Sequence, residues 1–214
     1  MLSDGVAFSE GRVRGFIHRA SGDGRDGLVL THGAGGNARM ALLEVVARAF
    51  ADAGICVLRC DLPFRLRRPY GPPSPASGAA DRMGLKEAAA VMRGLVPGRV
   101  FLGGQSYGGR QASVLAAEDG AATEGLLLLS YPLHPPGRPQ QARSGHWPAL
   151  RTPALFVHGS RDPFASSEEL RAAVALIPAL TRIVEIEGAG HDLGRGAWNA
   201  KEMVVEPFLE LMAR

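Results

Sequence analysis

Short apolar runs alternate along this chain with longer segments in which apolar residues recur at helical spacing. A run such as Gly27-Leu28-Val29-Leu30-Thr31 is typical of a strand that is buried on both faces of a parallel sheet. The period-2 alternation of residues 12–18 is typical of an edge strand instead. The predicted strands cover residues 12–18, 27–31, 55–60, 100 up to the serine at 106, 125–130, 154–158 and 181–186.

Segments with helical character follow most of these strands. The predicted helices cover residues 38–53, the segment from 79 to 95, the segment after Ser106 to 118, and residues 167–177 and 199–212. Asn37 is a good N-cap for the first helix, and Gly54 closes it. Strands that alternate with helices predict an α/β protein: one domain over residues 1–214 with a mostly parallel, twisted sheet and helices on both faces.

The composition is that of a soluble globular protein, and it narrows the classes of partner. The 214 residues are 46% apolar and 21% charged, and the formal net charge is only +3. The arginines are scattered, so we expect no nucleic-acid partner. No apolar run approaches the roughly 18 residues that a membrane span needs, and no signal-peptide pattern is present. We therefore expect no membrane association and a cytoplasmic location.

Cys56 and Cys60 both fall in the predicted strand 55–60. Residues four apart in a strand are separated by about 13 Å, which is far beyond the reach of a disulfide. We expect both to be small buried apolar residues in a reducing compartment.

A Gly-x-Ser-x-Gly motif, Gly104-Gln105-Ser106-Tyr107-Gly108, lies between an apolar strand and an alanine-rich helix. A serine at so sharp a strand-to-helix turn needs a strained backbone, and the flanking glycines let neighbouring chains pass close by. This context predicts a nucleophile elbow, in which the Ser106 hydroxyl stands clear of the sheet. The alternative is a glycine-rich turn that contains a serine by chance.

Residues with catalytic chemistry follow four predicted strands: His32-Gly33, Ser106, Asp162 and His191. In open α/β sheets, ligands bind at the carboxyl ends of the strands. A serine hydroxyl needs a base within hydrogen-bond reach, and an imidazole base needs a carboxylate to fix its tautomer. The chain order Ser106, Asp162, His191 is the order serine, acid, histidine. We predict that these three residues form a catalytic triad.

Six histidines compete for the role of base. His191 lies in a glycine-rich loop after the last strand, where its ring is free to lie over the sheet edge, and we expect it to be the base. His18 and His146 lie outside the carboxyl ends of the predicted strands, so we do not expect either to be the base. His32 begins the proposed oxyanion loop, and His134 and His158 flank turns, where a histidine is more often structural.

Three aspartates are candidates for the acid. Asp162 lies in the turn Gly159-Ser160-Arg161-Asp162-Pro163, which would present its carboxylate beside His191. Asp61 ends an earlier strand and is the rival. Asp192 is adjacent to the base, and neighbouring loop side chains rarely face each other. We predict Asp162.

Acyl transfer also needs hydrogen-bond donors for the oxyanion that develops on the substrate. We expect the Tyr107 amide to be one donor and the Ala34 amide, in the loop His32-Gly33-Ala34-Gly35-Gly36, to be the other. That glycine-rich loop could instead bind phosphate, but it lacks the Lys-Ser/Thr ending and the Rossmann spacing.

Two proline-rich stretches, residues 64–77 and 131–153, show no sustained helical period. We expect them to form a low rim that carries Tyr70, His134 and Trp147, with no large cap domain and no deep apolar tunnel. Arg110 lies one helical turn after Ser106. We expect it to pack or pair beneath the elbow, with recognition of a substrate carboxylate as the alternative.

Several stretches together resemble one protein family. These are Thr31-His32-Gly33-Ala34-Gly35-Gly36, residues 104–110, residues 129–137 and residues 157–164. The chain resembles small α/β hydrolases of the dienelactone-hydrolase-like kind, in a branch that includes the hydrolase-like domain of a histone-acetyltransferase-complex subunit. This resemblance implies an α/β-hydrolase fold and the triad Ser106, Asp162 and His191. Dienelactone hydrolases use a cysteine nucleophile, so their lactone activity is not carried over.

The sequence therefore predicts a serine hydrolase that cleaves small carboxylic esters or thioesters through an acyl-enzyme. We expect a small-molecule ester as its partner and no cofactor or metal ion. The alternative is a non-catalytic interaction module that retains the fold, since fold alone does not establish activity.

Overall fold

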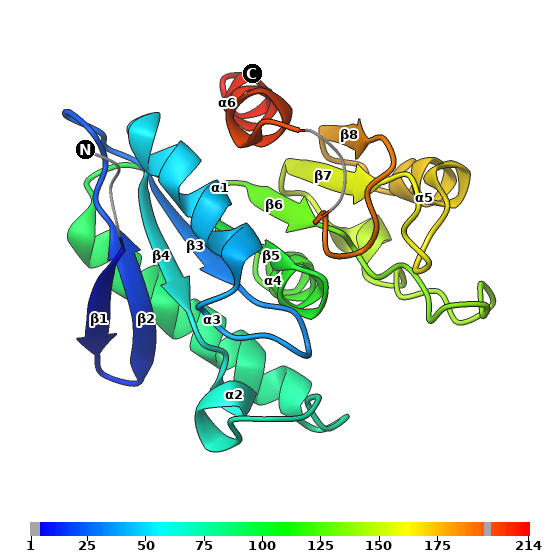
Figure 1. The fold of residues 1–214 in the computed structure, drawn as a ribbon, viewed down its shortest axis with the longest axis horizontal. Coiled ribbons are helices and arrows are strands. Elements are labelled where there is room, and N and C mark those ends of the chain that lie inside the picture. Colours follow the sequence, from blue (N-terminus) through cyan, green and yellow to red (C-terminus); the bar gives the residue numbers. More distant parts are fainter. Residues whose placement is uncertain (1–4, 195–197) are drawn as a thin grey trace.

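The structure is a computed structural model that describes residues 5–194 and 198–214. It contains one eight-stranded sheet in the order β1-β2-β4-β3-β5-β6-β7-β8 (Figure 1). The strands are β1 (Val6–Glu10), β2 (Val13–His18), β3 (Gly27–Thr31), β4 (Cys56–Cys60), β5 (Val100–Gln105), β6 (Leu126–Leu129), β7 (Ala154–Gly159) and β8 (Thr181–Ile186). All neighbours from β4 to β8 pair in parallel, whereas β2 is antiparallel to both β1 and β4. The predicted mostly parallel sheet is confirmed.

Helices cover both faces of this sheet, as predicted (Figure 1). One face packs against α1 (Ala41–Asp52) and α6 (Glu206–Met212), with Phe50 and Phe208 in edge-to-face contact between them. The other face packs against α3 (Ser77–Leu95), α4 (Tyr107–Glu118) and α5 (Ser167–Val174). The strands between β2 and β8 are almost entirely buried, which explains their unbroken apolar runs.

The N-terminal edge differs from the prediction. Residues 12–18 do not form the edge of the sheet, because β1 pairs outside β2 along its whole length. β1 is exposed at nearly every position, so its sequence carries no burial pattern. The sequence pattern therefore does not reveal β1, and the prediction that residues 12–18 form the edge of the sheet is wrong.

Helix boundaries differ at several points. Asn37 is not the N-cap of α1: its side chain accepts from the Arg39 amide in a turn, and Met40 is the N-cap. A short helix, α2 (Pro63–Arg67), begins the stretch predicted to be irregular. The predicted helix 199–212 is a π-turn (Lys201–Val205) followed by α6. Pro207 lies at this junction and has no amide hydrogen to donate to an α-helical turn.

The segment between β6 and β7 contains only one 3₁₀ turn, Trp147–Ala149, so no cap domain is inserted there. Trp147 is fully buried and packs against Tyr131 and Phe156 at ring-centroid distances of 4.9 and 5.4 Å. The prediction that Trp147 lies on an exposed rim is therefore wrong. A large aromatic side chain in a loop is as well suited to seal the core beneath that loop as to face a ligand.

Both cysteines are free and buried in β4, as predicted. Burial raises the pKa of the Cys60 thiol to about 12, so this thiol stays protonated at neutral pH.

Candidate active site

Ser106 occupies the turn between β5 and α4 with φ 51° and ψ −111°. This left-handed backbone is strained for a residue with a side chain. The turn is tight because a Cβ on Gly104 would lie 2.5 Å from the Thr31 carbonyl oxygen, and a Cβ on Gly108 would lie 2.5 Å from Thr31 Oγ1. The two glycines therefore let the elbow pass directly against the end of β3.

The structure brings Ser106, His191 and Asp162 together from three separate loops. His191 Nε2 lies 2.8 Å from Ser106 Oγ, and His191 Nδ1 lies 2.8 Å from Asp162 Oδ2. A neutral imidazole that donates from Nδ1 to the carboxylate has its Nε2 lone pair free to accept the serine proton. The arrangement thus places a base on the hydroxyl and an orienting carboxylate on the base.

Further contacts fix the acid and the ring. Asp162 Oδ1 accepts a hydrogen bond from the Phe164 amide at 2.9 Å, and the Phe164 ring stacks on the His191 ring with centroids 4.1 Å apart. Gln105 Nε2 donates to the His191 carbonyl oxygen at 3.1 Å. The residue before the nucleophile thereby ties the histidine loop to β5. Gln105 was not predicted to have this role, although the motif contains it.

Asp61 and Asp192, the two other candidates for the acid, do not contact the His191 side chain. Asp61 Oδ1 accepts from the Ala38 amide at 2.7 Å and lies 3.5 Å from His32 Nε2, on the side of the loop that follows β3. Asp192 is exposed and accepts from the Gly194 amide. Of the three predicted candidates, only Asp162 contacts His191.

The loop after β3 has a fixed peptide orientation at Ala34. The Gly33 carbonyl oxygen accepts from His32 Nδ1 at 2.8 Å and from the Gly36 amide at 3.1 Å. Because a trans peptide points its N–H away from its C=O, the Ala34 amide faces the opposite side of the loop. His32 Nε2 accepts from the Leu62 amide, so its proton is on Nδ1.

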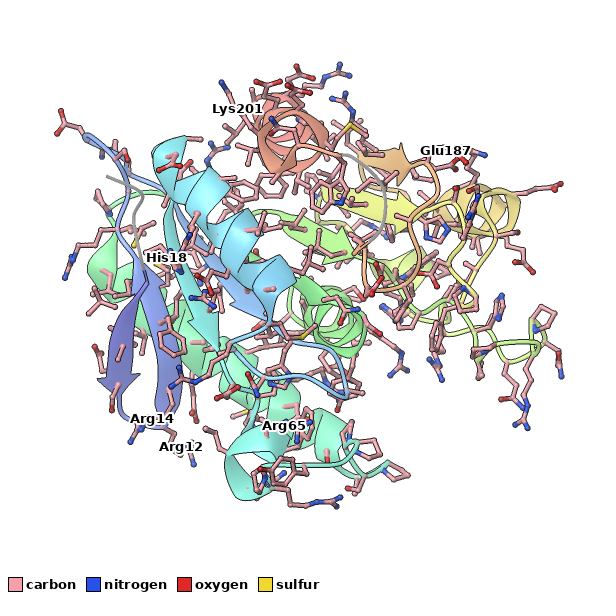
Figure 2. The ribbon with its side chains drawn as sticks, in the orientation of Figure 1. Arg12, Arg14, His18, Arg65, Glu187 and Lys201 are labelled. Atoms are coloured by element: carbon pink, nitrogen blue, oxygen red, sulfur yellow. The ribbon has the colours of Figure 1, made fainter. Side chains whose placement is uncertain are left out.

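Arg65 holds this loop from the other side. Its buried guanidinium donates to the carbonyl oxygens of Ala34, Gly36 and Gly71, and Figure 2 labels the side chain at α2. A single arginine thus fastens the loop after β3 to the proline-rich segment. Sequence reasoning missed this role because a run of arginines in a loop has the composition of an exposed surface.

A cavity of about 780 Å³ opens at Ser106. Segments 64–77 and 131–153 both contribute to its wall, as expected, with Ala34 and Tyr107 beside the serine. The residues from these two segments are Pro72, Pro73, Ser74, Pro75, Ala76, Pro132 and Arg143. A second hollow of about 720 Å³ lies between β2, α2 and α3 and contains none of the predicted triad residues.

The three aromatic residues predicted for the rim do not line this cavity. Tyr70 is 84% exposed and lies outside it. His134 is buried, with Nδ1 donating to the Pro135 carbonyl oxygen and Nε2 lying 3.4 Å from Glu169 of α5. Trp147 lies in the core. The lining instead includes four prolines and three arginines, and its aromatic residues are Tyr107 and Phe164.

Arg110 follows Ser106 by one turn of α4. Its side chain lines the cavity together with Ser106, and no ion pair of Arg110 occurs among the residues that the structure describes. The expectation that Arg110 pairs with a charged group under the turn is therefore wrong, whereas the expected packing is partly met, because the side chain is half-buried and its Nε is fully buried.

In residues 5–194 and 198–214, no cluster of histidine, cysteine, aspartate or glutamate side chains is arranged to hold a metal ion. Within the same residues, no helix is both long and apolar enough to cross a bilayer.

The fold and the site define an α/β hydrolase. A family model described as an alpha/beta hydrolase domain matches residues 24–202, and the chain belongs to this family. The fold is also similar to that of solved structures of low sequence identity. Est1E from Butyrivibrio proteoclasticus with ferulic acid bound is 15% identical, with a TM-score of 0.77 over 98% of this chain and 100% of that chain.

Two further structures share the fold. A dienelactone hydrolase from Anabaena variabilis is 21% identical, with a TM-score of 0.74 over 98% of this chain and 95% of that one. XC6422 from Xanthomonas campestris, described as a member of the α/β serine hydrolases without a lid, is 18% identical, with a TM-score of 0.68 over 91% of this chain and 88% of that one.

Three histidines outside the proposed triad have pKa values below the ordinary value. Burial lowers the pKa of His32 and of His158, and it lowers the pKa of His146 to about 4, with Arg110 and Arg82 adding to the effect. His146 Nε2 donates to Ser113 Oγ, which in turn donates to the Arg110 carbonyl oxygen. The neutral ring thereby ties the loop after β6 to α4.

This burial predicts a loss of stability in acid. Between pH 6.5 and pH 4, the unfolded chain protonates His146 while the folded chain does not, so the free energy of unfolding falls as the pH falls. His146→Gln keeps a donor for Ser113 and removes the titration. Urea unfolding across this range should show a shallower pH dependence for His146→Gln than for the natural protein. Parallel curves would contradict the assignment.

Proposed function

We propose that this protein is a serine hydrolase that cleaves small carboxylic esters or thioesters through an acyl-enzyme. The observation that carries the proposal is the continuous chain of hydrogen bonds from Asp162 through His191 to Ser106 Oγ at a strained elbow. A serine in a merely structural turn needs neither a base nor an oriented carboxylate. The hydrogen-bonded set of Ser106, His191 and Asp162 also favours a catalytic function over that of a non-catalytic interaction module.

In the first half of the reaction, His191 Nε2 takes the proton from Ser106 Oγ as this oxygen attacks the carbonyl carbon. The carbonyl oxygen becomes an oxyanion, and the amides of Tyr107 and Ala34 donate hydrogen bonds to it. Tyr107 is the first residue of α4, where amides have no acceptor within the helix. Loss of one such donor costs roughly 3 kcal/mol of transition-state stabilisation.

The tetrahedral intermediate then collapses. The bond from the carbonyl carbon to the leaving oxygen or sulfur breaks, and the protonated His191 gives its proton to that leaving group. Water enters, loses a proton to His191, and attacks the carbonyl carbon of the acyl-enzyme. The bond from this carbon to Ser106 Oγ then breaks, Oγ takes the proton from His191, and the acid is released. The Asp162 carboxylate stabilises the imidazolium in both halves. Every step uses groups of this chain and water, so the proposal needs no cofactor.

The proposed nucleophile should react with a fluorophosphonate probe. We expect the natural protein to gain the mass of one phosphonyl group, and Ser106→Ala to gain none and to lose several orders of magnitude in kcat on p-nitrophenyl acetate. The matched control is Ser130→Ala: Ser130 is also buried and has a positive φ, but it directly follows β6 and contacts no histidine by a hydrogen bond among the residues that the structure describes. Labelling that persists in Ser106→Ala would refute the proposal.

The short loops around the cavity predict a preference for small acyl groups. Each buried methylene contributes about 0.8 kcal/mol, but only where an apolar pocket encloses it. Here the segment after β6 forms one 3₁₀ turn and no inserted domain. For p-nitrophenyl esters of increasing chain length, kcat/KM should be highest between acetyl and butyryl and should not rise toward decanoyl. A steady rise toward long chains would show an acyl tunnel and contradict this prediction.

A further inference from the structure

The cavity at Ser106 has a positively charged wall. Among the residues that the structure describes, the lining side chains include three arginines, Arg82, Arg110 and Arg143, and no aspartate or glutamate. They come from three separate elements, which are α3, α4 and the loop between β6 and β7. Such a concentration of one charge sign at a reactive serine needs an explanation, because each charge is partly removed from water.

Of these three arginines, Arg82 alone pairs with a carboxylate from the part of the chain that the structure describes. Its Nε donates to Glu118 at 2.8 Å, and its Nη1 donates to the Gln111 amide oxygen. Within residues 5–194 and 198–214, the guanidinium groups of Arg110 and Arg143 make no hydrogen bond or ion pair. The Nε atom of Arg110 is buried without a partner. Two guanidinium groups without an acceptor in the described part of the protein therefore belong to side chains that line the cavity.

The groups around these two arginines carry no negative charge that could compensate them. Burial raises the pKa of Tyr131 to about 12 and lowers that of His146 to about 4, so both are neutral at pH 7. Burial, followed by the nearby charge of Arg110, lowers the pKa of Arg143. The buried carboxylate of Asp81 lies behind Tyr107, where it accepts from the Tyr107 hydroxyl and the Phe64 amide.

Arg143 is also held in place by its backbone. Its amide donates to the Leu133 carbonyl oxygen at 2.7 Å, and its carbonyl oxygen accepts from the Tyr131 hydroxyl at 2.8 Å. Arg110 is fixed by the first turn of α4, since its amide donates to the Ser106 carbonyl oxygen. Two arginines on a fixed backbone bind an anion at a lower entropic cost than two on mobile loops.

The position of the cavity identifies the half of the ester that meets these arginines. Ser106 and the two proposed oxyanion donors line the cavity together with the three arginines, whereas His191 approaches it through Phe164, whose ring stacks on the imidazole. The leaving group must receive its proton from His191, so it lies on the histidine side of the serine. The acyl group then extends into the cavity toward Arg110, which lies one helical turn, about 6 Å, further along α4.

We propose that the natural substrates are esters or thioesters whose short acyl group ends in an anionic group, a carboxylate or a phosphonate-like group, bound by Arg110 and Arg143. This inference rests on the proposed function and adds the substrate class to it. Two guanidinium groups suit such an anion because each can donate two parallel hydrogen bonds to its oxygens.

The test compares two p-nitrophenyl esters of matched shape: the monoester of adipic acid, which carries a free carboxylate, and its methyl ester, which does not. We expect the natural protein to have a higher kcat/KM for the carboxylate. Arg110→Gln and Arg143→Gln should each lower the carboxylate-to-methyl-ester ratio by about tenfold, the range expected for a hydrogen-bonded charge. Because the ratio is taken within each variant, any loss of folded protein cancels.

Arg138→Gln is the matched control, because Arg138 lies in the same loop as Arg143 but is exposed and outside the cavity. Its ratio should equal that of the natural protein. A p-nitrophenyl ester of phosphonovaleric acid distinguishes the two kinds of anion, and the better of the two anionic esters identifies the group that is bound.

Three results would overturn the inference. The first is an equal kcat/KM for the charged and the neutral adipate ester. If Ser106 is still labelled by the fluorophosphonate in that case, the inference fails but the proposed function stands. The second is a ratio that Arg110→Gln and Arg143→Gln leave unchanged. The third is a preference for 4-carboxyphenyl acetate over phenyl acetate that depends on the same arginines, which would place the anion in the leaving group. If Ser106 is not labelled, both proposals fail.

Discussion

The strained backbone of Ser106 is the constraint on which the site depends. The positive φ of Ser106 directs its hydroxyl away from the edge of the sheet. This strained backbone is retained because Gly104 and Gly108 let the turn pack against the end of β3. Any side chain at either glycine would push the elbow away from Thr31. The same turn directs the first residues of α4 to the cavity, so one local geometry places both the nucleophile and Arg110.

The loops around the elbow are fixed by buried polar groups rather than by apolar packing. Gln105 ties the histidine loop to β5, His32 orients the Gly33–Ala34 peptide, and Arg65 joins the loop after β3 to the proline-rich segment. Each contact is made to a backbone carbonyl oxygen, so it fixes the chain itself. This pre-organisation matters for catalysis because oxyanion donors are effective only when they need not reorganise during the reaction.

The sequence predicted the sheet and the strand-end residues well, since buried parallel strands and the elbow motif are both local signals. The sequence-based predictions were wrong or incomplete where a feature depends on contacts between segments that are distant along the chain. β1 is exposed and patternless, the start of the last helix depends on Pro207, and Trp147 turns inward to Tyr131 and Phe156. The roles of Arg65 and Arg110 depend on which loops meet in space, and no spacing along the chain reveals that a guanidinium is buried or left without a carboxylate.

The most direct test of this account compares two conservative changes, Asp162→Asn and Asp61→Asn. Each replaces a carboxylate by an amide of the same shape, and each aspartate accepts one backbone amide in the structure. If Asp162 fixes the tautomer of His191, Asp162→Asn should lower kcat for p-nitrophenyl acetate by about 10⁴-fold. Asp61→Asn should lower it by less than about tenfold, because that carboxylate only supports the loop after β3. Equal losses, or a larger loss at Asp61, would contradict the proposed triad.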